Sequence, residues 1–334
     1  MKARKLAIVG ATGAVGQEIL NVLEKRSFPY DELVLLASAR SAGKKIHFRG
    51  TDYTVQELTK DSFHGIDLAL FSAGGSISKE FGPAAVSAGT IVVDNSSAFR
   101  MDPEVPLVVP EINPEDAKKH KGILANPNCS TIIMLMAVFP IYKLYGVRRV
   151  VVSTYQAASG AGAAAMQELE EQAKAMLAGQ TPPTEAFPYP LAFNVFSHNS
   201  SMYPENGYNQ EEVKMVKESH KILHREDLKI SPTCVRVGTF RAHAESIHLE
   251  LEQSGDLDTI RKALSEFPGV QVTDNVEKNH FPMPLEVSGL DDVYVGRLRW
   301  DLGDTEKRNL QLFCCGDQLL KGAALNAVQI AEIL

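Results

Sequence analysis

The chain has 334 residues, a formal net charge of −7, 44% hydrophobic residues and 22% charged residues. Domains usually hold about 100–200 residues, so we expect two domains with the composition of a soluble globular protein. The acidic balance argues against nucleic-acid binding, which needs a clustered basic face. No apolar run approaches the roughly 20 residues of a membrane helix, and the N-terminus lacks the apolar core of a signal peptide. We therefore expect a cytoplasmic protein, with a plastid location left open if a transit peptide has been removed.

Apolar runs alternate with helical patterns over the first part of the chain. Strands that alternate with helices indicate an α/β domain, with a parallel sheet and helices on both of its faces. The predicted strands are Lys5–Val9, Leu33–Ala37, Asp67–Phe71 and Thr90–Asp94, and the predicted helices are Ala14–Lys25 and Ser78–Ala88.

The pattern changes after about residue 130, where several apolar runs predict a mixed or antiparallel sheet in an α+β domain. Residues 180–210 are rich in Pro, Asn, Ser and aromatic residues and predict a long irregular segment. The helix before it is expected to end at Gly179, since glycine commonly follows the last turn of a helix. The predicted helices are Thr131–Leu144, Ala163–Ala178, Lys214–His224 and Gln318–Leu334, and the predicted strands are Val147–Tyr155, Cys234–Phe240, Ser246–Glu252, Tyr294–Trp300 and Leu310–Cys315.

A glycine-rich turn follows the first predicted strand and opens the first predicted helix. Its sequence is Gly10-Ala11-Thr12-Gly13-Ala14-Val15-Gly16. Glycine allows a sharp turn and lets backbone N–H groups approach a pyrophosphate at the start of a helix. The turn therefore predicts a Rossmann-type dinucleotide-binding domain, the alternative being an ordinary tight turn between a strand and a helix.

The end of the second predicted strand bears on the choice of cofactor. NAD-binding sites usually have Asp or Glu there, which binds the ribose 2′-hydroxyl. This chain has Ala37-Ser38-Ala39-Arg40-Ser41, with no acidic residue. Arginine forms charge-assisted hydrogen bonds with phosphate oxygens, so Ser38, Arg40 and Ser41 could hold a 2′-phosphate. We therefore expect NADP, the alternative being a surface loop with an ordinary arginine.

One of the four cysteines stands at the start of a predicted helix. Cys129 lies in Asn126-Pro127-Asn128-Cys129-Ser130-Thr131, where the helix dipole and unpaired N–H groups favour a reactive thiolate. The alternative is a buried structural cysteine, an interpretation that suits Cys234, Cys314 and Cys315 in their strand-like runs. Adjacent Cys314 and Cys315 would point to opposite faces of a strand, so no disulfide is expected between them. No cysteine spacing is typical of a metal site, and no metal is expected.

A thiol nucleophile needs an acid/base partner, and the chain has nine histidines. His220 and His224 have the i, i+4 spacing of some metal ligands, but they lie in a highly charged helix with no third ligand nearby. His243 lies between two predicted strands, in a position common for catalytic groups. From spacing alone, His243 is the leading candidate among several.

Together these motifs resemble the aspartate-β-semialdehyde dehydrogenase family. The resemblance covers nearly the whole chain in order, and a coincidental match to such an ordered set is not expected. The matching segments are Gly10–Gly16, Ser38–Gly43, Asp94–Arg100, Asn126–Thr131, Gln156–Gly162, Glu211–Lys214, Arg236–His243 and Asp317–Ala331.

The resemblance implies a role for each matching residue. It implies that Cys129 is the nucleophile, that His243 is the acid/base, and that Gln156 contacts the substrate and helps to orient the thiol. Arg236 matches the residue that binds the substrate carboxylate, and Glu211 a contact to the substrate amine. Arg100 and Lys214 match the phosphate-binding pair. The residues expected near the cofactor are Gly10, Thr12, Gly13, Ala14, Val15, Gly16, Ser38, Arg40, Ser41, Ser159, Gly160 and Gln318.

One position departs from the family pattern. The family often has Asp-Asn-Leu before the last helix, whereas this chain has Asp317-Gln318-Leu319. Glutamine keeps the amide but is longer, which puts the cofactor contact of Gln318 in doubt.

The resemblance also implies the domain organisation and the reaction. Residues 1–128, completed by the helical segment 317–334, would form an NADP-binding Rossmann domain, and residues 129–316 a catalytic and dimerisation domain. The reaction would interconvert L-aspartate-4-semialdehyde, phosphate and NADP+ with 4-aspartyl phosphate and NADPH, through a thioester on Cys129. It would serve lysine or diaminopimelate, threonine and methionine biosynthesis, in a homodimer or homotetramer.

Four other functions fit the sequence less well. N-acetyl-γ-glutamyl-phosphate reductases typically have Pro-Gly-Cys-Tyr at the nucleophile, whereas this chain has Pro-Asn-Cys-Ser. Glyceraldehyde-3-phosphate dehydrogenases have a Ser-Cys-Thr-Thr-Asn-Cys run that is absent here, and short-chain dehydrogenases need a Tyr-x-x-x-Lys motif that no tyrosine provides. A non-catalytic NADP-binding sensor would be expected to lose Cys129 or His243, and both are present.

Overall fold

The computed structural model describes residues 5–334 and divides the chain into two compact units. The first unit ends at Asn128 and takes up the chain again from Gly322 to Leu334, and the second is Cys129–Lys321. In this division the chain returns to the first unit at Gly322, whereas the resemblance implied a return at residue 317. Residues 317 and 318 stay with the second unit because Asp317 pairs with Arg241 at 2.5 Å and Gln318 Oε1 accepts the N–H of Ala242 at 2.9 Å.

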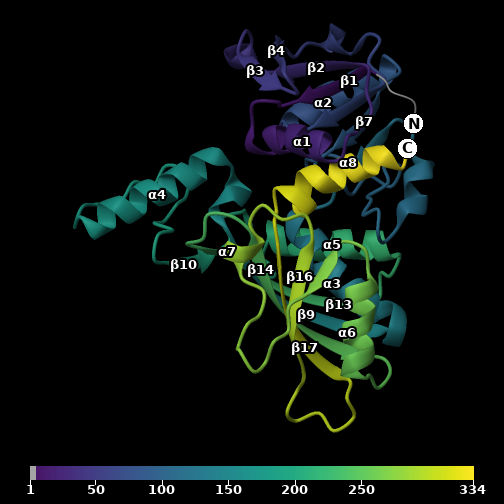
Figure 1. Ribbon diagram of the computed structural model, residues 1–334, viewed down its shortest axis with the longest axis vertical. Coiled ribbons are helices and arrows are strands. Elements are labelled where there is room, and N and C mark those ends of the chain that lie inside the picture. Colours follow the sequence, from purple (N-terminus) through teal and green to yellow (C-terminus); the bar gives the residue numbers. More distant parts are fainter. Residues whose placement is uncertain (1–4) are drawn as a thin grey trace. The chain divides into compact units, whose positions relative to one another are not determined.

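A six-stranded sheet forms the centre of the first unit (Figure 1). Every strand pair in it is parallel, as predicted, and the order is β5-β2-β1-β6-β7-β8. The short strands β5 and β8 were not predicted, because two or three residues carry no readable alternation. The bounds are β1 (Lys5–Val9), β2 (Glu32–Ala37), β5 (Gln56–Glu57), β6 (Leu68–Phe71), β7 (Ile91–Asp94) and β8 (Ile123–Ala125), with a separate hairpin of β3 (Lys45–Phe48) and β4 (Thr51–Thr54).

Three α-helices pack around this sheet. Helix α1 (Ala14–Lys25) packs against the C-terminal helix α8 (Leu325–Glu332). Helix α2 (Gly75–Ser87) adds Ala85 to an apolar cluster that includes Val9 and Phe71 of the sheet. The α-helix at the C-terminus is shorter than predicted, because Leu320–Ala324 form a π-helix before it.

The second unit has a mixed seven-stranded sheet in the order β10-β13-β9-β14-β17-β16-β15. Strands β9 and β13 are parallel, as are β15 and β16, and the other neighbours are antiparallel, so the predicted mixed sheet is confirmed. The bounds are β9 (Val147–Gln156), β10 (Val195–Ser197), β13 (Lys229–Val237), β14 (His243–Leu251), β15 (Val270–Val272), β16 (Val293–Trp300) and β17 (Asn309–Gly316), with a separate pair of β11 (Met202–Tyr203) and β12 (Tyr208–Asn209).

Helices cover one face of this second sheet (Figure 1). Helix α3 (Cys129–Tyr145) packs on the central strands, flanked by α5 (Gln210–Leu223) and α6 (Leu257–Glu266). Most side chains of α3 are buried, which matches its apolar sequence from end to end. The other face is partly open, and Val151 and Tyr155 of β9 remain 39% and 38% exposed.

Helix α4 (Ala163–Leu177) holds the irregular segment predicted at residues 180–210. The buried carboxylate of Glu168 accepts the backbone N–H groups of Glu185 and Phe187 at 2.6 and 3.2 Å. One turn later, Gln172 Oε1 accepts the N–H of Leu191 at 2.7 Å. The first part of this segment, up to Leu191, has no regular structure and satisfies these backbone groups through two side chains of one helix. Further along, the short strands β10, β11 and β12 fall within the segment that was predicted to be irregular.

Two rows of side chains cross the sheet beneath α3. In the first row Arg236 of β13 pairs with Gln156 of β9. Two residues earlier in β13 and β9, a second row consists of Cys234, Thr154, Glu245 and Cys314, one from each of β13, β9, β14 and β17. All four members of the second row are at most 1% exposed.

Glu245 is the ionisable residue at the centre of that second row. It is fully buried, and neither of its carboxyl oxygens has a hydrogen-bond partner among the described residues. Burial raises the pKa of Glu245 well above its usual value of 4.5, so the folded chain keeps this proton to a higher pH than the unfolded chain does. The unfolded chain ionises this group above about pH 4.5, and the free energy of unfolding therefore falls as the pH rises.

The Glu245→Gln variant tests this arrangement, because glutamine keeps the shape of the protonated acid but cannot ionise. We expect little change in the free energy of unfolding at pH 5 and a gain at pH 8. While Glu245 is protonated in the folded wild type and ionised in the unfolded chain, each further pH unit lowers the free energy of unfolding by about 1.4 kcal/mol, and glutamine removes this loss. Urea unfolding at the two pH values measures it. Glu266→Gln, at an exposed position of α6, is the control and should show no such pH dependence. An equal change for Glu245→Gln at both pH values would contradict the protonated state.

Candidate active site

The glycine-rich turn between β1 and α1 can only be built with glycines at two of its positions. Gly10 has a φ of +85°, and a Cβ there would lie 2.4 Å from the carbonyl oxygen of Ser72. A Cβ on Gly16 would lie 2.3 Å from the oxygen of Gly10. Gly13 is the N-cap residue of α1 and supplies no side-chain cap to the first turn, which also lacks an acidic residue. The start of α1 thus offers backbone N–H groups to an anion, in keeping with a dinucleotide site.

The residues expected to bind a 2′-phosphate follow β2 directly. Ser38 and Arg40 are exposed, whereas Ser41 is buried. The hydroxyl of Ser41 lies 3.4 Å from the hydroxyl of Thr12 in the glycine-rich turn. The two cofactor segments predicted from sequence therefore lie side by side in the first unit.

Arg100 is a buried arginine of the first unit. Its Nε donates to the backbone oxygen of Asn126 at 2.9 Å, and its Nη2 donates to that of Asn95, also at 2.9 Å. The loop before it is held by Asp94, whose carboxylate accepts hydrogen bonds from the hydroxyls of Ser78 and Ser96, both at 2.7 Å. A guanidinium fixed in this way is pre-organised for an anion such as phosphate.

Cys129 is the first residue of α3, where the sequence placed it. It is half-buried, whereas Cys234, Cys314 and Cys315 are buried, and none of the four forms a disulfide. Burial raises the pKa of each of the other three thiols, which makes them inert. Cys315 packs with Ala244 on the open side of the sheet, away from Cys314, as their alternation along the strand predicted. Cys129 alone among the four combines access with a helix N-terminus.

The sequence predicted that His243 lies in a loop between two strands. In the structure it is instead the first residue of β14. The antiparallel pairing with β17 already begins at His243, opposite Gly316, and it takes this residue into the sheet. Its side chain is 1% exposed, and its Nδ1 accepts the N–H of Ala157 at 3.0 Å. Burial, followed by the charge of Arg236, lowers the pKa of His243 to about 3. The neutral ring therefore carries its proton on Nε2.

Arg236 is buried beside His243. Its Nε donates to Asn199 Oδ1 at 3.0 Å and its Nη1 to the oxygen of Ala157 at 3.2 Å, and the ring of Phe187 lies beneath the guanidinium. Burial lowers the pKa of Arg236, while the charges of Glu211 and Cys129 raise it. Nη2 makes no hydrogen bond within residues 5–334, so this edge of the guanidinium can bind a carboxylate.

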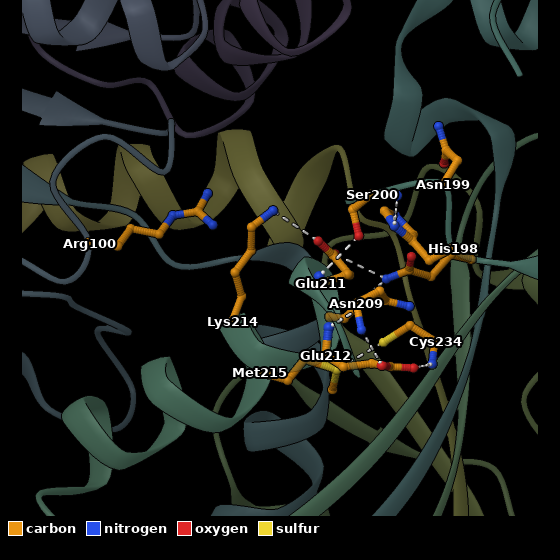
Figure 2. A network of polar contacts seen from close by, with 12 residues as sticks. Arg100, His198, Asn199, Ser200, Asn209, Glu211, Glu212, Lys214, Met215 and Cys234 are labelled. Atoms are coloured by element: carbon orange, nitrogen blue, oxygen red, sulfur yellow. Dashed lines mark hydrogen bonds and ion pairs between the residues drawn. The ribbon is translucent and has the colours of Figure 1, made fainter. Parts of the chain in front are cut away.

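Glu211 lies in the first turn of α5 and Lys214 three residues later, and Figure 2 shows them with their neighbours. The helix starts at a capping box in which Asn209 and Glu212 bind each other's backbone N–H groups. Glu211 pairs with Lys214 at 3.1 Å and accepts from Gln156 Nε2 at 3.2 Å. The same amide also bonds the hydroxyl of Ser130, next to Cys129. Gln156 therefore connects the start of α3 with the acid of α5.

The segment after β9 brings Ser159 and Gly160 to the same place. A Cβ on Gly160 would lie 3.0 Å from Arg236 Nη1 and 3.2 Å from His243 Nε2, so both side chains converge on this glycine. The Ser159 hydroxyl bonds the amide of Gln318. Gln318, the residue that departs from the family pattern, thus lies beside the segment that the sequence assigned to the cofactor.

Three residues of this site were missed by the sequence analysis. His198, Asn199 and Ser200 line it from the irregular segment (Figure 2). Asn199 bonds Arg236, and the Ser200 hydroxyl accepts the N–H of Glu211 at 3.2 Å. Burial, and then Arg236, lowers the pKa of His198 to about 4. No sequence signal singles these residues out, because serine and asparagine are ordinary in irregular segments and nothing links them to a strand far along the chain.

Residues 5–334 contain no group of three or more His, Cys, Asp or Glu side chains that could hold a metal ion. No helix in the same range is both long and apolar enough to span a membrane.

Comparisons with known proteins agree with both units. Residues 5–120 match the sequence model of the semialdehyde dehydrogenase NAD-binding domain, and residues 138–321 match that of the semialdehyde dehydrogenase dimerisation domain. The aspartate-semialdehyde dehydrogenase of Synechocystis is 52% identical over 330 residues, covering 99% of this chain and 97% of the relative. That of Aquifex aeolicus is 53% identical over 334 residues, with the same coverage.

A solved structure is similar over the full length. The crystal structure of aspartate semialdehyde dehydrogenase II from Vibrio cholerae, complexed with ASA, superposes with a TM-score of 0.96 at 42% identity. The alignment covers 100% of this chain and 98% of that one. The two-domain architecture is therefore that of this group of enzymes.

Proposed function

The chain belongs to the aspartate-semialdehyde dehydrogenase family, and from this premise we propose that it is an NADP-dependent enzyme that reduces 4-aspartyl phosphate to L-aspartate-4-semialdehyde and releases phosphate. The observation that carries the proposal is the convergence of Arg236, His243 and the Glu211–Lys214 pair in the unit whose longest helix begins at Cys129. The aldehyde is a precursor of lysine or diaminopimelate, threonine and methionine. We therefore assign the enzyme to that biosynthesis.

Cys129 is the proposed nucleophile. Its position at the start of α3, without an acidic residue in the first turn, favours the thiolate. The thiolate attacks the acyl carbon, the bond from carbon to the phosphate oxygen breaks, and phosphate leaves a thioester on Cys129. Backbone N–H groups at the helix start can hold the oxyanion that forms in this step.

The charges of the site match the groups of the substrate. Arg236 presents its free Nη2 edge to the α-carboxylate, and Glu211 binds the α-ammonium group. Lys214 of the second unit and Arg100 of the first are the proposed phosphate ligands. This division leaves one cation for the carboxylate and two for the phosphate.

Gln156 and His243 act on the reacting centre. Gln156, held between Ser130 and Glu211, contacts the substrate and helps to orient the thiol. His243 exchanges a proton with the oxygen of the hemithioacetal through Nε2, the ring nitrogen that Ala157 leaves free for the site. Burial of His243 keeps water from competing for that proton.

The first unit is the proposed NADP site. The compact turn at Gly10 and Gly16 lets a pyrophosphate approach the start of α1, and Arg40 with its neighbouring serines follows β2, where NAD-specific enzymes have an acid. Bound NADPH supplies the hydride that reduces the thioester. Ser159, Gly160 and Gln318 are the proposed contacts of the second unit to the nicotinamide end.

A homodimer is the proposed assembly, with a tetramer as a further step. The second unit matches a dimerisation domain, and one face of its sheet exposes large side chains, among them Val151 and Tyr155. A sheet face with exposed large apolar residues is typical of a subunit interface.

Substrate choice tests the proposed function directly. With NADP+ and phosphate, we expect turnover of aspartate semialdehyde, little turnover of N-acetylglutamate semialdehyde, and no NADPH formation when phosphate is omitted. NADPH absorbance measures all three. A preference for the acetylated substrate would instead favour an N-acetyl-γ-glutamyl-phosphate reductase.

The Cys129→Ala variant tests the thioester. We expect turnover to be abolished while NADP binding, followed by fluorescence or calorimetry, is retained, because most of the proposed cofactor residues lie in the first unit. Cys234→Ala is the matched control, since that thiol is buried in β13 and should be dispensable for chemistry. Retained activity in Cys129→Ala would exclude the covalent mechanism.

The Arg40→Asp variant tests the choice of cofactor. An acid at this position can bind a ribose 2′-hydroxyl and repels a 2′-phosphate, so the ratio of kcat/KM for NADP to that for NAD should fall. Lys44→Asp makes the same charge change nearby, outside the proposed phosphate site, and controls for net charge. An unchanged ratio in Arg40→Asp would rule out the hypothesis that Arg40 selects NADP by binding its 2′-phosphate.

A further inference from the structure

The position of Arg100 depends on two backbone carbonyl groups. As described above, its Nε and Nη2 donate to the oxygens of Asn126 and Asn95, each at 2.9 Å. These two bonds tie the direction of the guanidinium to the orientation of the two peptide groups. Any residue that fixes those peptides also fixes the arginine.

The two carbonyl-bearing residues are bonded to each other through their side chains. Asn126 Nδ2 donates to Asn95 Oδ1 at 2.7 Å. The backbone N–H of Asn126 donates to the oxygen of Asp94 at 2.8 Å, but β8 already ends at Ala125. Beyond that one bond, no ladder continues past Ala125, and the Asn126 peptide depends on side-chain contacts.

The C-terminal helix supplies the remaining contact. Asn326 of α8 donates from Nδ2 to Asn126 Oδ1 at 2.6 Å and to the oxygen of Val108 at 3.0 Å. Asn126 Nδ2 also reaches the oxygen of Ala323, at 3.4 Å. Asn126 and Asn326 are both fully buried, so water cannot replace a lost partner without rearrangement.

We propose that Asn326 is a positioning residue for phosphate binding: by holding Asn126, it fixes the carbonyl group that directs the Arg100 guanidinium. The chain from α8 to the arginine is Asn326, Asn126, Arg100, and every step is a hydrogen bond of 2.9 Å or less. This inference rests on the proposed phosphate-binding role of Arg100. The C-terminal helix α8, which carries Asn326, would then contribute to phosphate binding.

The Asn326→Ala variant removes the donor to Asn126 Oδ1. In the direction of aldehyde oxidation, we expect KM for phosphate to rise about tenfold, equivalent to about 1.4 kcal/mol. KM for the aldehyde and for NADP, and kcat at saturating phosphate, should change less than about twofold. The rise in melting temperature caused by added phosphate should shrink in parallel, which gives a readout independent of turnover.

Gln329→Ala is the matched control. Gln329 lies one turn further along α8 and bonds Glu111 at 2.8 Å, so its loss also weakens the attachment of the helix without touching the asparagine chain. It should leave KM for phosphate unchanged. If both variants alter all kinetic constants alike, Asn326 serves only the packing of α8 and the proposal is wrong.

A double-variant cycle with Arg100→Lys separates the inference from the function on which it rests. Lysine keeps the charge but not the fork that uses the two carbonyls, so Asn326→Ala should add little to the KM for phosphate in that background. Full additivity overturns the proposal. If Arg100→Lys alone leaves KM for phosphate unchanged, the phosphate role of Arg100 fails and the inference fails with it.

A substitution that prevents folding does not end the test. Asn326→Ser keeps a hydroxyl donor in the helix and should fall between the wild type and alanine in KM for phosphate. A serine variant that folds and matches the wild type in KM for phosphate, melting temperature and phosphate-dependent shift would count against a role for Asn326.

Discussion

The register of β9 with its two neighbours is the constraint on which the site of the second unit depends. The parallel pairing with β13 sets Arg236 opposite Gln156, and the antiparallel pairing with β14 brings His243 to the same end of the sheet. A slip of one residue would turn every one of these side chains to the opposite face. The same register aligns the buried row around Glu245. A shift of one strand by one residue would therefore also expose apolar residues that are now buried.

Burial of charged and ionisable groups gives this site its electrostatic character. His243 and His198 are held neutral by burial and by the charge of Arg236, while Glu211 balances the cations around it. An anionic substrate entering such a site meets Arg236, a cation that is already fixed and desolvated. Little reorganisation is then needed when charge moves during the reaction.

Much of this organisation could be predicted, and the failures have identifiable causes. The parallel and mixed sheets, the turn at Gly10–Gly16 and Cys129 at a helix start followed from apolar periodicity and glycine spacing. His243 was predicted in a loop because Arg241 and Ala242 interrupt the alternation, yet pairing with β17 draws it into a strand. Short strands such as β5 were missed because two residues cannot display a period.

The sequence by itself determined the chemistry of single segments: a glycine turn for a dinucleotide, no acid after the second strand, and a thiol before an apolar helix. These are local properties, set by backbone conformation and by neighbours within a few residues. Only the tertiary structure decided which distant residues act together. Asn199 reaches Arg236, and Asn326 reaches Asn126, across long stretches of chain. Such contacts depend on strand register and helix docking, which no short window of sequence encodes.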